Sequence, residues 1–323
     1  MPARPISLES IQAALRRIRP DVGATPVLRS STLDERFSRR FFFKCENLQK
    51  TGSFKVRGAM NAVRCLTAEQ AARGVCTHSS GNHGQAVAFA AAARGIACTV
   101  VVPDNTPQPK VDAIRGYGAR VQLCEYARRQ ATCDEIAAQS GAHVIHPYDD
   151  ADVMSGQGTL ALELLASVPE LDAIIVPVSG GGLVGGIAEA AKAIKPSIRV
   201  YGVEPKGKGL GECLAKGTRR LTESLAPLDT IADAIRTKSV GERPWVVLRE
   251  LLEPTVFEVD DAQIREALRF SMQRMKLVVE PAGACALAAV LSGQLRGEVP
   301  EGASVGLVVC RGNADLKNLA SLL

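Results

Sequence analysis

The stretch Lys50–Ala59, KTGSFKVRGA, places one lysine between two apolar residues, directly after a Gly-Ser turn. Ser53 is a favoured helix N-cap and residues 54–66 contain no proline, so the sequence predicts a helix with Lys55 in its first turn. Apolar neighbours and the positive end of the helix dipole both lower the pKa of such a lysine. An unprotonated amine can form a Schiff base with an aldehyde. From this stretch alone, an ordinary surface lysine whose stem covers apolar neighbours is the more common explanation.

Strand-like and helix-like segments alternate from residue 74 onward, which predicts parallel strands joined by right-handed crossovers. The expected strands are 75–78, 98–103, 120–124, 173–178, 199–203, 255–259 and 305–309. The expected helices include 85–94, 109–117, 128–140, 159–167, 183–194 and 261–275. We therefore expect an α/β protein of two parallel-sheet lobes with the site in the cleft between them. Residues 1–73 and 148–323 would form the large domain, and residues 74–147 the small one.

A glycine run follows the apolar strand near residue 176 and opens the next helix. Its residues are Ser179, Gly180, Gly181, Gly182 and Leu183. Backbone N–H groups at such a helix start can approach a phosphate. The same run fits G-x-G-x-x-G, and Glu204 ends the next strand near the place where a dinucleotide enzyme holds ribose. The loop therefore predicts a phosphate site, and on its own it leaves a nicotinamide cofactor open.

A second polar turn, SSGNHG at residues 79–84, lies between a predicted strand and a predicted helix. Small polar side chains and free backbone N–H groups at a helix start suit an anionic group such as a carboxylate. A purely structural turn with a serine or asparagine cap explains this stretch equally well.

The lysine stretch is similar to that of the fold-type II pyridoxal-phosphate enzymes, which have the fold of the tryptophan synthase β subunit. Four more stretches match this family: THSSGNHGQA, GQGTLALE, VPVSGGGLVGG and RMKLVVEPAGA. The resemblance covers nearly the whole chain, and the nearest branches are the serine racemases and the serine/threonine dehydratases. It implies pyridoxal 5′-phosphate as cofactor, a small amino-acid substrate and a homodimer.

The resemblance also implies roles for single residues. Lys55 would carry the cofactor as an internal aldimine and act as a catalytic base, and Ser80 matches the serine that racemases use as a second proton donor. The cofactor-binding residues would be Phe54, Lys55, Asn82, Ser179, Gly180, Gly181, Gly182, Leu183 and Cys310. The substrate would contact Ser79, Ser80, Asn82 and His83.

Two positions depart from the family pattern. Cys310 and Arg311 replace the Ser-Gly that usually meets the pyridine nitrogen. A thiol is still an uncharged partner, and a ring left neutral favours β-elimination, whereas the arginine is the larger change. Metal-dependent relatives bind a divalent cation through a glutamate at position 204 and an aspartate six residues later. Here Lys208 and Leu210 occupy that loop, so we expect no metal.

These observations predict a pyridoxal-phosphate-dependent dehydratase (ammonia-lyase). Its substrate would be a β-hydroxy-α-amino acid such as L-threonine or L-serine, and its products a 2-oxo acid and ammonia, with Lys55 as general base. The alternative is a racemase of serine or another amino acid that uses Lys55 and Ser80. A further alternative is a dehydratase for 3-hydroxyaspartate, phenylserine or a product of hydroxyectoine breakdown. A β-replacement synthase and a nicotinamide oxidoreductase are rivals from other classes.

Composition narrows the class of partner. The chain has 323 residues and a net charge of +5, but its basic residues are scattered and form no stripe typical of nucleic-acid binding. Nine cysteines without a C-x-x-C pair favour a reducing compartment over a disulfide scaffold. No apolar run long enough to span a bilayer is free of charge. We expect a cytoplasmic protein with no nucleic-acid or membrane partner.

Overall fold

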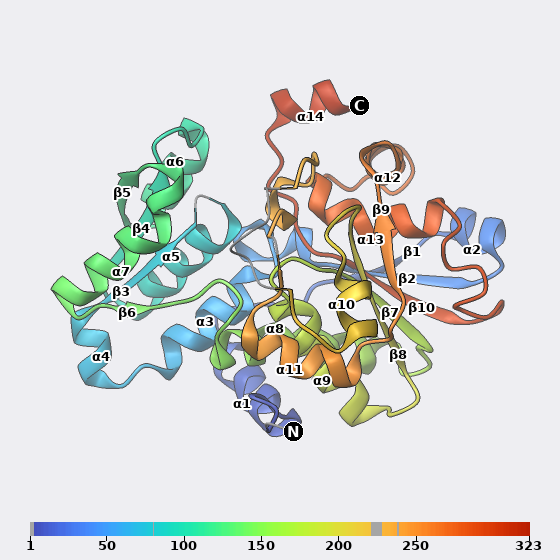
Figure 1. Cartoon of the computed structure of the whole chain (residues 1–323), viewed down its shortest axis with the longest axis horizontal. Helices are drawn as coiled ribbons and strands as arrows, with labels where there is room; N and C mark the ends of the chain where they lie inside the picture. The colour runs from blue at the N-terminus through green and yellow to red at the C-terminus, as the bar shows by residue number, and fades with distance from the viewer. Residues whose placement is uncertain (1–2, 80, 221–227, 238) are drawn as a thin grey trace.

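The computed structural model describes residues 3–79, 81–220, 228–237 and 239–323, and these form two β-sheets (Figure 1). The six-stranded sheet has the order β1-β2-β10-β7-β8-β9, and the four-stranded sheet has the order β5-β4-β3-β6. Every neighbouring pair is parallel except β1 and β2. The predicted α/β fold with two parallel sheets is therefore confirmed, with one antiparallel edge strand that was not predicted.

The strands of the larger sheet are β1 (Val27–Arg29), β2 (Arg40–Cys45), β7 (Ala173–Pro177), β8 (Arg199–Pro205), β9 (Val256–Val259) and β10 (Ser304–Val309). Those of the smaller sheet are β3 (Val75–His78), β4 (Cys98–Pro103), β5 (Arg120–Cys124) and β6 (His143–Val144). The helices are α1 (Leu8–Ile18), α2 (Ser31–Phe37), α3 (Lys55–Cys65), α4 (Ala68–Arg73), α5 (Asn82–Arg94), α6 (Gln108–Gly116), α7 (Arg129–Ser140), α8 (Ala151–Ser167), α9 (Gly182–Ile194), α10 (Leu210–Lys216), α11 (Glu242–Leu251), α12 (Asp261–Gln273), α13 (Pro281–Leu291) and α14 (Leu316–Leu322). Short 3-10 helices are η1 (Glu46–Leu48), η2 (Lys50–Gly52), η3 (Tyr126–Arg128) and η4 (Asp233–Ile235).

Helices cover both faces of the larger sheet, because successive residues of a strand point to opposite sides. Ile174 and Val176 of β7 belong to the hydrophobic cluster that includes residues of α8, α9 and α11. Ile175 belongs to the cluster formed with α12 and α13. Figure 1 shows these two groups of helices on opposite sides of the sheet. Strands buried on both faces consist of nearly continuous apolar residues, which is why β7 and β10 are recognisable from the sequence.

The lysine helix α3 lies between the two sheets. Val56 and Met60 share a hydrophobic cluster with Ala86 and Val87 of α5 and with Val153 of α8. The same helix therefore packs against an element of each predicted domain. All strands of the smaller sheet fall inside residues 74–147, and where one domain ends and the other begins stays a prediction.

The prediction that Ser53 caps the lysine helix is wrong. The backbone of Ser53 is extended and forms a β-bridge with Arg311. The N–H of Phe54 donates to the carbonyl of Cys310 at 3.2 Å, and α3 begins at Lys55 without a side-chain cap. The end of β10, rather than a local cap, thus fixes where the helix starts.

Two helices begin three or more residues earlier than predicted. Helix α8 begins at Ala151 instead of residue 159, because the side chain of Asp150 accepts a hydrogen bond from the N–H of Val153 at 2.9 Å. This helix contains Gly156 and Gly158, where neighbouring helices pack closely against its backbone. A Cβ on Gly156 would lie 2.5 Å from the carbonyl oxygen of Arg57 in α3. Helix α5 begins at Asn82 instead of residue 85, which places the asparagine in its first turn.

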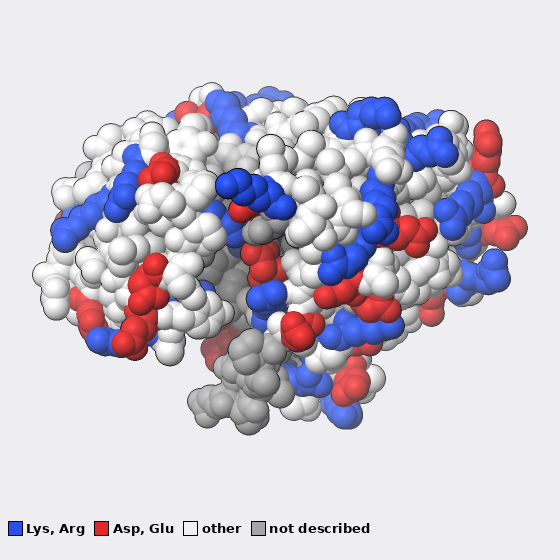
Figure 2. Space-filling view, turned by 90° about the horizontal axis from the view of Figure 1, so that it is seen from above, with Lys and Arg blue, Asp and Glu red and all other residues white. Residues whose placement is uncertain are grey.

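The surface carries charges of both signs. On the face shown in Figure 2, lysine and arginine side chains alternate with aspartate and glutamate side chains and form no single basic stripe. None of the helices in the described part of the chain combines the length and apolar character that crossing a bilayer would require.

Candidate active site

Lys55 is a buried lysine in the first turn of α3. Its side chain is 8% exposed, and Nζ donates to the carbonyl oxygen of Pro147 at 2.5 Å. Burial and, to a smaller extent, the positive charge of Arg311 together lower the pKa of Lys55 to about 7, while Cys310 opposes the shift. A substantial fraction of the amine is therefore unprotonated near neutral pH, as a nucleophile or general base requires.

Two cations lie close to the ring of Phe54. Nζ of Lys55 is 5.2 Å from the ring centroid and the guanidinium carbon of Arg311 is 5.3 Å from it. Phe54 is itself buried. A ring face attracts positive charge, so Phe54 favours the positions of both side chains near it.

The asparagine turn is tied to two other loops. Nδ2 of Asn82 donates to both carboxylate oxygens of Glu280, each at 3.1 Å. Oδ1 of Asn82 accepts from Nδ2 of Asn313 at 2.6 Å, and Asn313 also donates to the carbonyl of Thr51 at 2.7 Å. The orientation of the Asn82 amide is therefore fixed by Glu280, which precedes α13, and by Asn313, which follows β10.

The first turn of α5 offers backbone N–H groups that have no partner inside the helix. His83 lies in this turn, and its Nε2 is 3.0 Å from the carbonyl oxygen of Ile145. Burial, followed by the nearby charge of Lys55, holds the pKa of His83 well below its usual range, so the imidazole is neutral. Ser79 accepts a hydrogen bond from the N–H of Gly81 at 3.3 Å. Ser80, the predicted second proton donor, lies outside the described residues.

The glycine loop is shaped by close contacts that only glycine permits. A Cβ on Gly180 would lie 2.2 Å from the ring of Tyr148, and one on Gly182 would lie 2.8 Å from the Tyr148 carbonyl oxygen. Gly181 has a φ of +90°, in the left-handed region that favours glycine. The loop leads directly into α9, whose first turn contains the buried Leu183. Its N–H groups lie at the positive end of this helix, as a phosphate-binding loop requires.

A buried lysine holds the start of the glycine loop. Nζ of Lys208 donates to the carbonyls of Val178 and Ser179 at 2.7 and 2.6 Å. Burial lowers the pKa of Lys208 and raises that of Glu204, and the opposite charge of each partner counteracts the shift. One carboxylate oxygen of Glu204 accepts from the N–H of Leu210 at 2.7 Å. The described residues contain no group of three or more metal-ligating side chains.

Cys310 lies at the end of β10 and is buried. Its thiol donates to the carbonyl oxygen of Ala282 at 3.5 Å. Burial raises the pKa of Cys310 to about 12. The thiol therefore stays uncharged across the physiological range and remains a weak hydrogen-bond donor.

The polar groups around Lys55 fit pyridoxal phosphate. The lysine amine suits an aldehyde, the glycine loop a phosphate, and Asn82 a ring hydroxyl. Several buried polar atoms here have no hydrogen-bond partner within the described structure, which indicates a polar ligand. These atoms are Oγ1 of Thr51, Oγ of Ser53, Nδ1 of His83 and Nε of Arg311.

Some residues of this site were not assigned by sequence reasoning. Glu280 lies in the matched stretch RMKLVVEPAGA, where an acidic residue before the helix-starting Pro281 was the available signal. Asn313 directly follows Cys310, Arg311 and Gly312, and this position next to a candidate cofactor residue was the available signal for it. Tyr148 had no signal, because only the fold brings its ring to the glycine loop.

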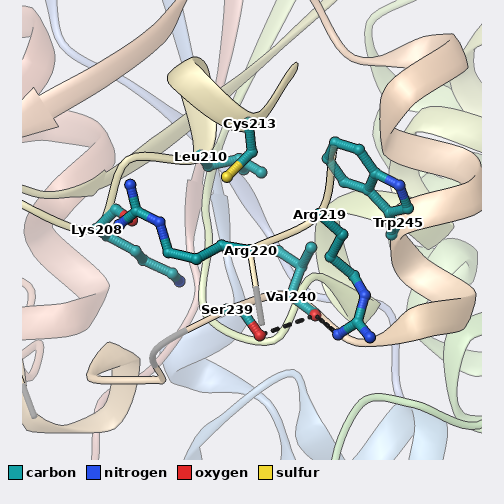
Figure 3. Close-up of a pocket in the computed structure, with 8 residues that line it drawn as sticks. All are labelled: Lys208, Leu210, Cys213, Arg219, Arg220, Ser239, Val240 and Trp245. Atoms are coloured by element: carbon teal, nitrogen blue, oxygen red, sulfur yellow. Dashed lines mark hydrogen bonds between the residues drawn. The ribbon is translucent and has the colours of Figure 1, made fainter. Parts of the chain in front are cut away.

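A separate pocket lies beyond the glycine loop (Figure 3). Its charged side chains are already bound within the protein. Arg219 donates to the carbonyl of Val240 at 3.2 Å, and Arg220 donates to the carbonyl of Lys208 at 2.7 Å. Apolar side chains such as Trp245 form much of the remaining lining. We assign no ligand to this pocket.

Comparison with known proteins identifies relatives along the whole chain. A family model described as "Pyridoxal-phosphate dependent enzyme" matches residues 18–311. A serine racemase of Arabidopsis thaliana is 45% identical over 314 residues, covering 96% of this chain and 94% of the relative. The crystal structure of a pyridoxal 5′-phosphate-dependent aspartate racemase superposes with a TM-score of 0.95 at 44% identity, covering 99% of both chains. The crystal structure of a T.th. threonine deaminase follows with a TM-score of 0.89 at 40% identity, covering 96% of this chain and 99% of that one.

These relatives change the order of the predicted activities. From the sequence, a dehydratase is the first prediction and a racemase the alternative. The racemases among the relatives support the second prediction better than the first. The likeness to threonine deaminase keeps the elimination reaction as the runner-up.

Proposed function

The chain belongs to the family of pyridoxal-phosphate dependent enzymes, and on that premise we propose that it is an amino-acid racemase acting on serine. Its cofactor is pyridoxal 5′-phosphate. The observation that carries the proposal is the 45% identity to a serine racemase over 96% of this chain. The site adds a buried lysine with a lowered pKa beside a helix N-terminus suited to a carboxylate.

Each group has a defined task in this proposal. Bound pyridoxal phosphate supplies an electron sink that acidifies the Cα–H bond of the amino acid. The first turn of α5, with Asn82 and the neutral His83, binds the substrate carboxylate. Nζ of Lys55 removes or returns the Cα proton on one face. Ser80 does the same on the opposite face, an assignment that rests on resemblance alone.

Elimination is the second candidate function. It would release the β-hydroxyl of serine or threonine as water, and a water molecule would then hydrolyse the released enamine to a 2-oxo acid and ammonia. The likeness to threonine deaminase favours it. The uncharged Cys310 favours it as well, because a cofactor ring that stays neutral would be a weaker electron sink. We also propose that the enzyme acts as a homodimer in the cytoplasm.

Product analysis tests the proposal. The holoenzyme is incubated with L-serine and, separately, with L-threonine, and D-serine and 2-oxo acids are quantified together. We expect D-serine to form faster than pyruvate. Pyruvate without D-serine would contradict the racemase and favour the dehydratase. Lys55→Ala is the control, and it should abolish both products, whereas Lys216→Ala on the exposed face of α10 should retain them.

A further inference from the structure

Arg311 is a buried arginine in the site, and its Nε–H is a buried donor without a hydrogen-bond partner among the described residues. It is 5% exposed and lies at the end of β10, next to Cys310. Its Nη1 donates to the carbonyl of Ala234 at 3.1 Å and lies 3.5 Å from Oε1 of Glu280.

An unused donor on a buried charge is costly, commonly by about 1–3 kcal/mol or more. A guanidinium cannot lose its proton in a protein, so Nε–H can only donate and needs an acceptor. The guanidinium lies over the same Phe54 ring as the amine of Lys55. The missing acceptor therefore belongs to a group bound close to Lys55.

The bound cofactor offers few acceptors for this position. Its phosphate is accounted for by the glycine loop at the start of α9. Its ring hydroxyl is accounted for by Asn82, whose amide is already held by Glu280 and Asn313. The ring nitrogen is the acceptor that remains. The neighbouring Cys310 competes poorly for it, because its thiol is a weak donor and is directed to the carbonyl of Ala282.

We propose that the Nε–H of Arg311 donates a hydrogen bond to the ring nitrogen of bound pyridoxal phosphate and thereby keeps that nitrogen unprotonated. Only a neutral pyridine nitrogen has the lone pair to accept this bond. The fixed positive charge also disfavours a second positive charge on the ring. This assignment concerns the cofactor, so it holds whether the enzyme racemises or eliminates.

Glu280 supports this arrangement without competing for the ring. Both of its oxygens accept from Asn82, and one lies beside Arg311. Burial raises the pKa of Glu280, and the charge of Arg311 opposes that shift. The carboxylate is thus bound to its two partners, and it positions Asn82 and Arg311 relative to each other.

Cofactor binding to the apoprotein provides the test. The affinity for pyridoxal phosphate is compared with that for the analogue in which C–H replaces the ring nitrogen. We expect the wild-type protein to bind the analogue about tenfold more weakly, the value of one hydrogen bond to a charged donor. The Arg311→Met protein should bind the two compounds with affinities that differ by less than about twofold, because methionine cannot donate a hydrogen bond to the ring nitrogen. Equal discrimination by the variant and the wild type would overturn the assignment and leave Nε for another acceptor, such as the substrate.

A matched control and a second variant keep the result interpretable. Arg39 is another buried arginine, and it donates to the carbonyls of Phe37 and Val299 near the start of β2. Arg39→Met should keep the wild-type discrimination. If Arg311→Met fails to fold because Glu280 loses its ion pair, the double variant Arg311→Met/Glu280→Gln removes both charges together.

Nitrogen NMR of the holoenzyme gives a readout independent of affinity. With the ring nitrogen labelled, we expect the chemical shift of a neutral pyridine in the wild-type protein between pH 6 and 9. The shift of a pyridinium in the wild type would overturn the proposal. The Arg311→Met protein should show a changed shift, whereas Arg39→Met should not, and an unchanged shift in Arg311→Met would also overturn it.

Discussion

At the scale of single residues, the chemistry depends on the protonation of one amine. Lys55 has a lowered pKa because it is buried next to the cationic Arg311. Only the unprotonated amine can attack the cofactor aldehyde. The rate at which apoprotein takes up pyridoxal phosphate should therefore increase as the pH rises through about 7. A stopped-flow pH profile measures this, and a midpoint near the ordinary lysine value of 10.5 would contradict the structure.

The glycine loop has no room for a larger side chain at Gly180, and this leads to a prediction. Gly180→Ala places a methyl group 2.2 Å from the ring of Tyr148, so the loop or the ring must move. We expect cofactor affinity to fall by about tenfold or more, in keeping with the 1–3 kcal/mol typical of overpacking. Fluorescence titration of the apoprotein measures the loss. Gly23→Ala, where nothing lies within 4 Å, is the control, and an equal affinity of the two variants would refute the role of the contact.

At the scale of elements, a buried ion network fixes the lysine helix. Arg57 of α3 is fully buried and donates to Glu46 at 2.8 Å and to Glu163 of α8 at 2.7 Å. Lys44 of β2 completes the network through Glu163 at 2.6 Å. The network connects the start of the lysine helix to the larger sheet and to α8, and so it limits where Lys55 can lie.

Removal of Arg57 should therefore destabilise the protein strongly. Arg57→Met leaves two carboxylates without their shared partner, and breaking a buried pair in this way costs about 3–5 kcal/mol. Urea unfolding of the holoenzyme measures the change. Arg73→Met, which removes an exposed pair with Glu69, should change the unfolding free energy by less than about 0.5 kcal/mol. Similar values for the two variants would show that the network does not hold α3.

Lys208 supports the glycine loop in a comparable way. Lys208→Met removes the donor shared by the carbonyls of Val178 and Ser179, at a cost of about 1–3 kcal/mol. We expect a lower melting temperature and weaker cofactor binding, both measured on the purified protein. Lys216→Met on the exposed side of α10 is the control. Unchanged cofactor affinity in Lys208→Met would contradict this role.

At the scale of the whole molecule, a feature could be predicted from the sequence when residues close to it in the chain determine it, and could not when tertiary contacts do. Strands β4 and β5 were predicted at their observed bounds, because the apolar run of β4 and the polar/apolar alternation of β5 are both local signals. The start of α8 was not predicted, and it contains Gly156 and Gly158, which are weak helix formers by themselves but allow close helix packing in the folded chain. The ion network of Arg57 and the contact of Tyr148 with the glycine loop depend on tertiary structure alone.

The candidate site was predictable to a similar extent. Lys55, Asn82 and the glycine loop lie in stretches that match a known family, so the sequence named them as candidates, and their individual roles stay predictions. Arg311 departs from that family, and its position over Phe54 beside Glu280 became visible only in the folded chain.

The cofactor should link the two lobes. Asn82 begins a helix of the smaller lobe, whereas the glycine loop and Arg311 follow strands of the larger sheet. A ligand that contacts all three stabilises the folded state by about 2.7 kcal/mol at a free concentration one hundred times its dissociation constant. Cofactor removal should lower the melting temperature and reduce hydrogen-exchange protection in both α5 and α9. Loss of protection in one lobe alone would contradict a site shared between them.

The most direct test of the central claim follows the Cα proton of serine. L-serine is incubated with the holoenzyme in deuterium oxide, and the recovered serine is separated by chirality and analysed by mass spectrometry. The proposed racemase predicts D-serine that carries deuterium at Cα, formed by the wild-type protein and absent with Lys55→Ala. If the wild-type protein forms pyruvate while the remaining serine stays in the L form, the racemase assignment is wrong.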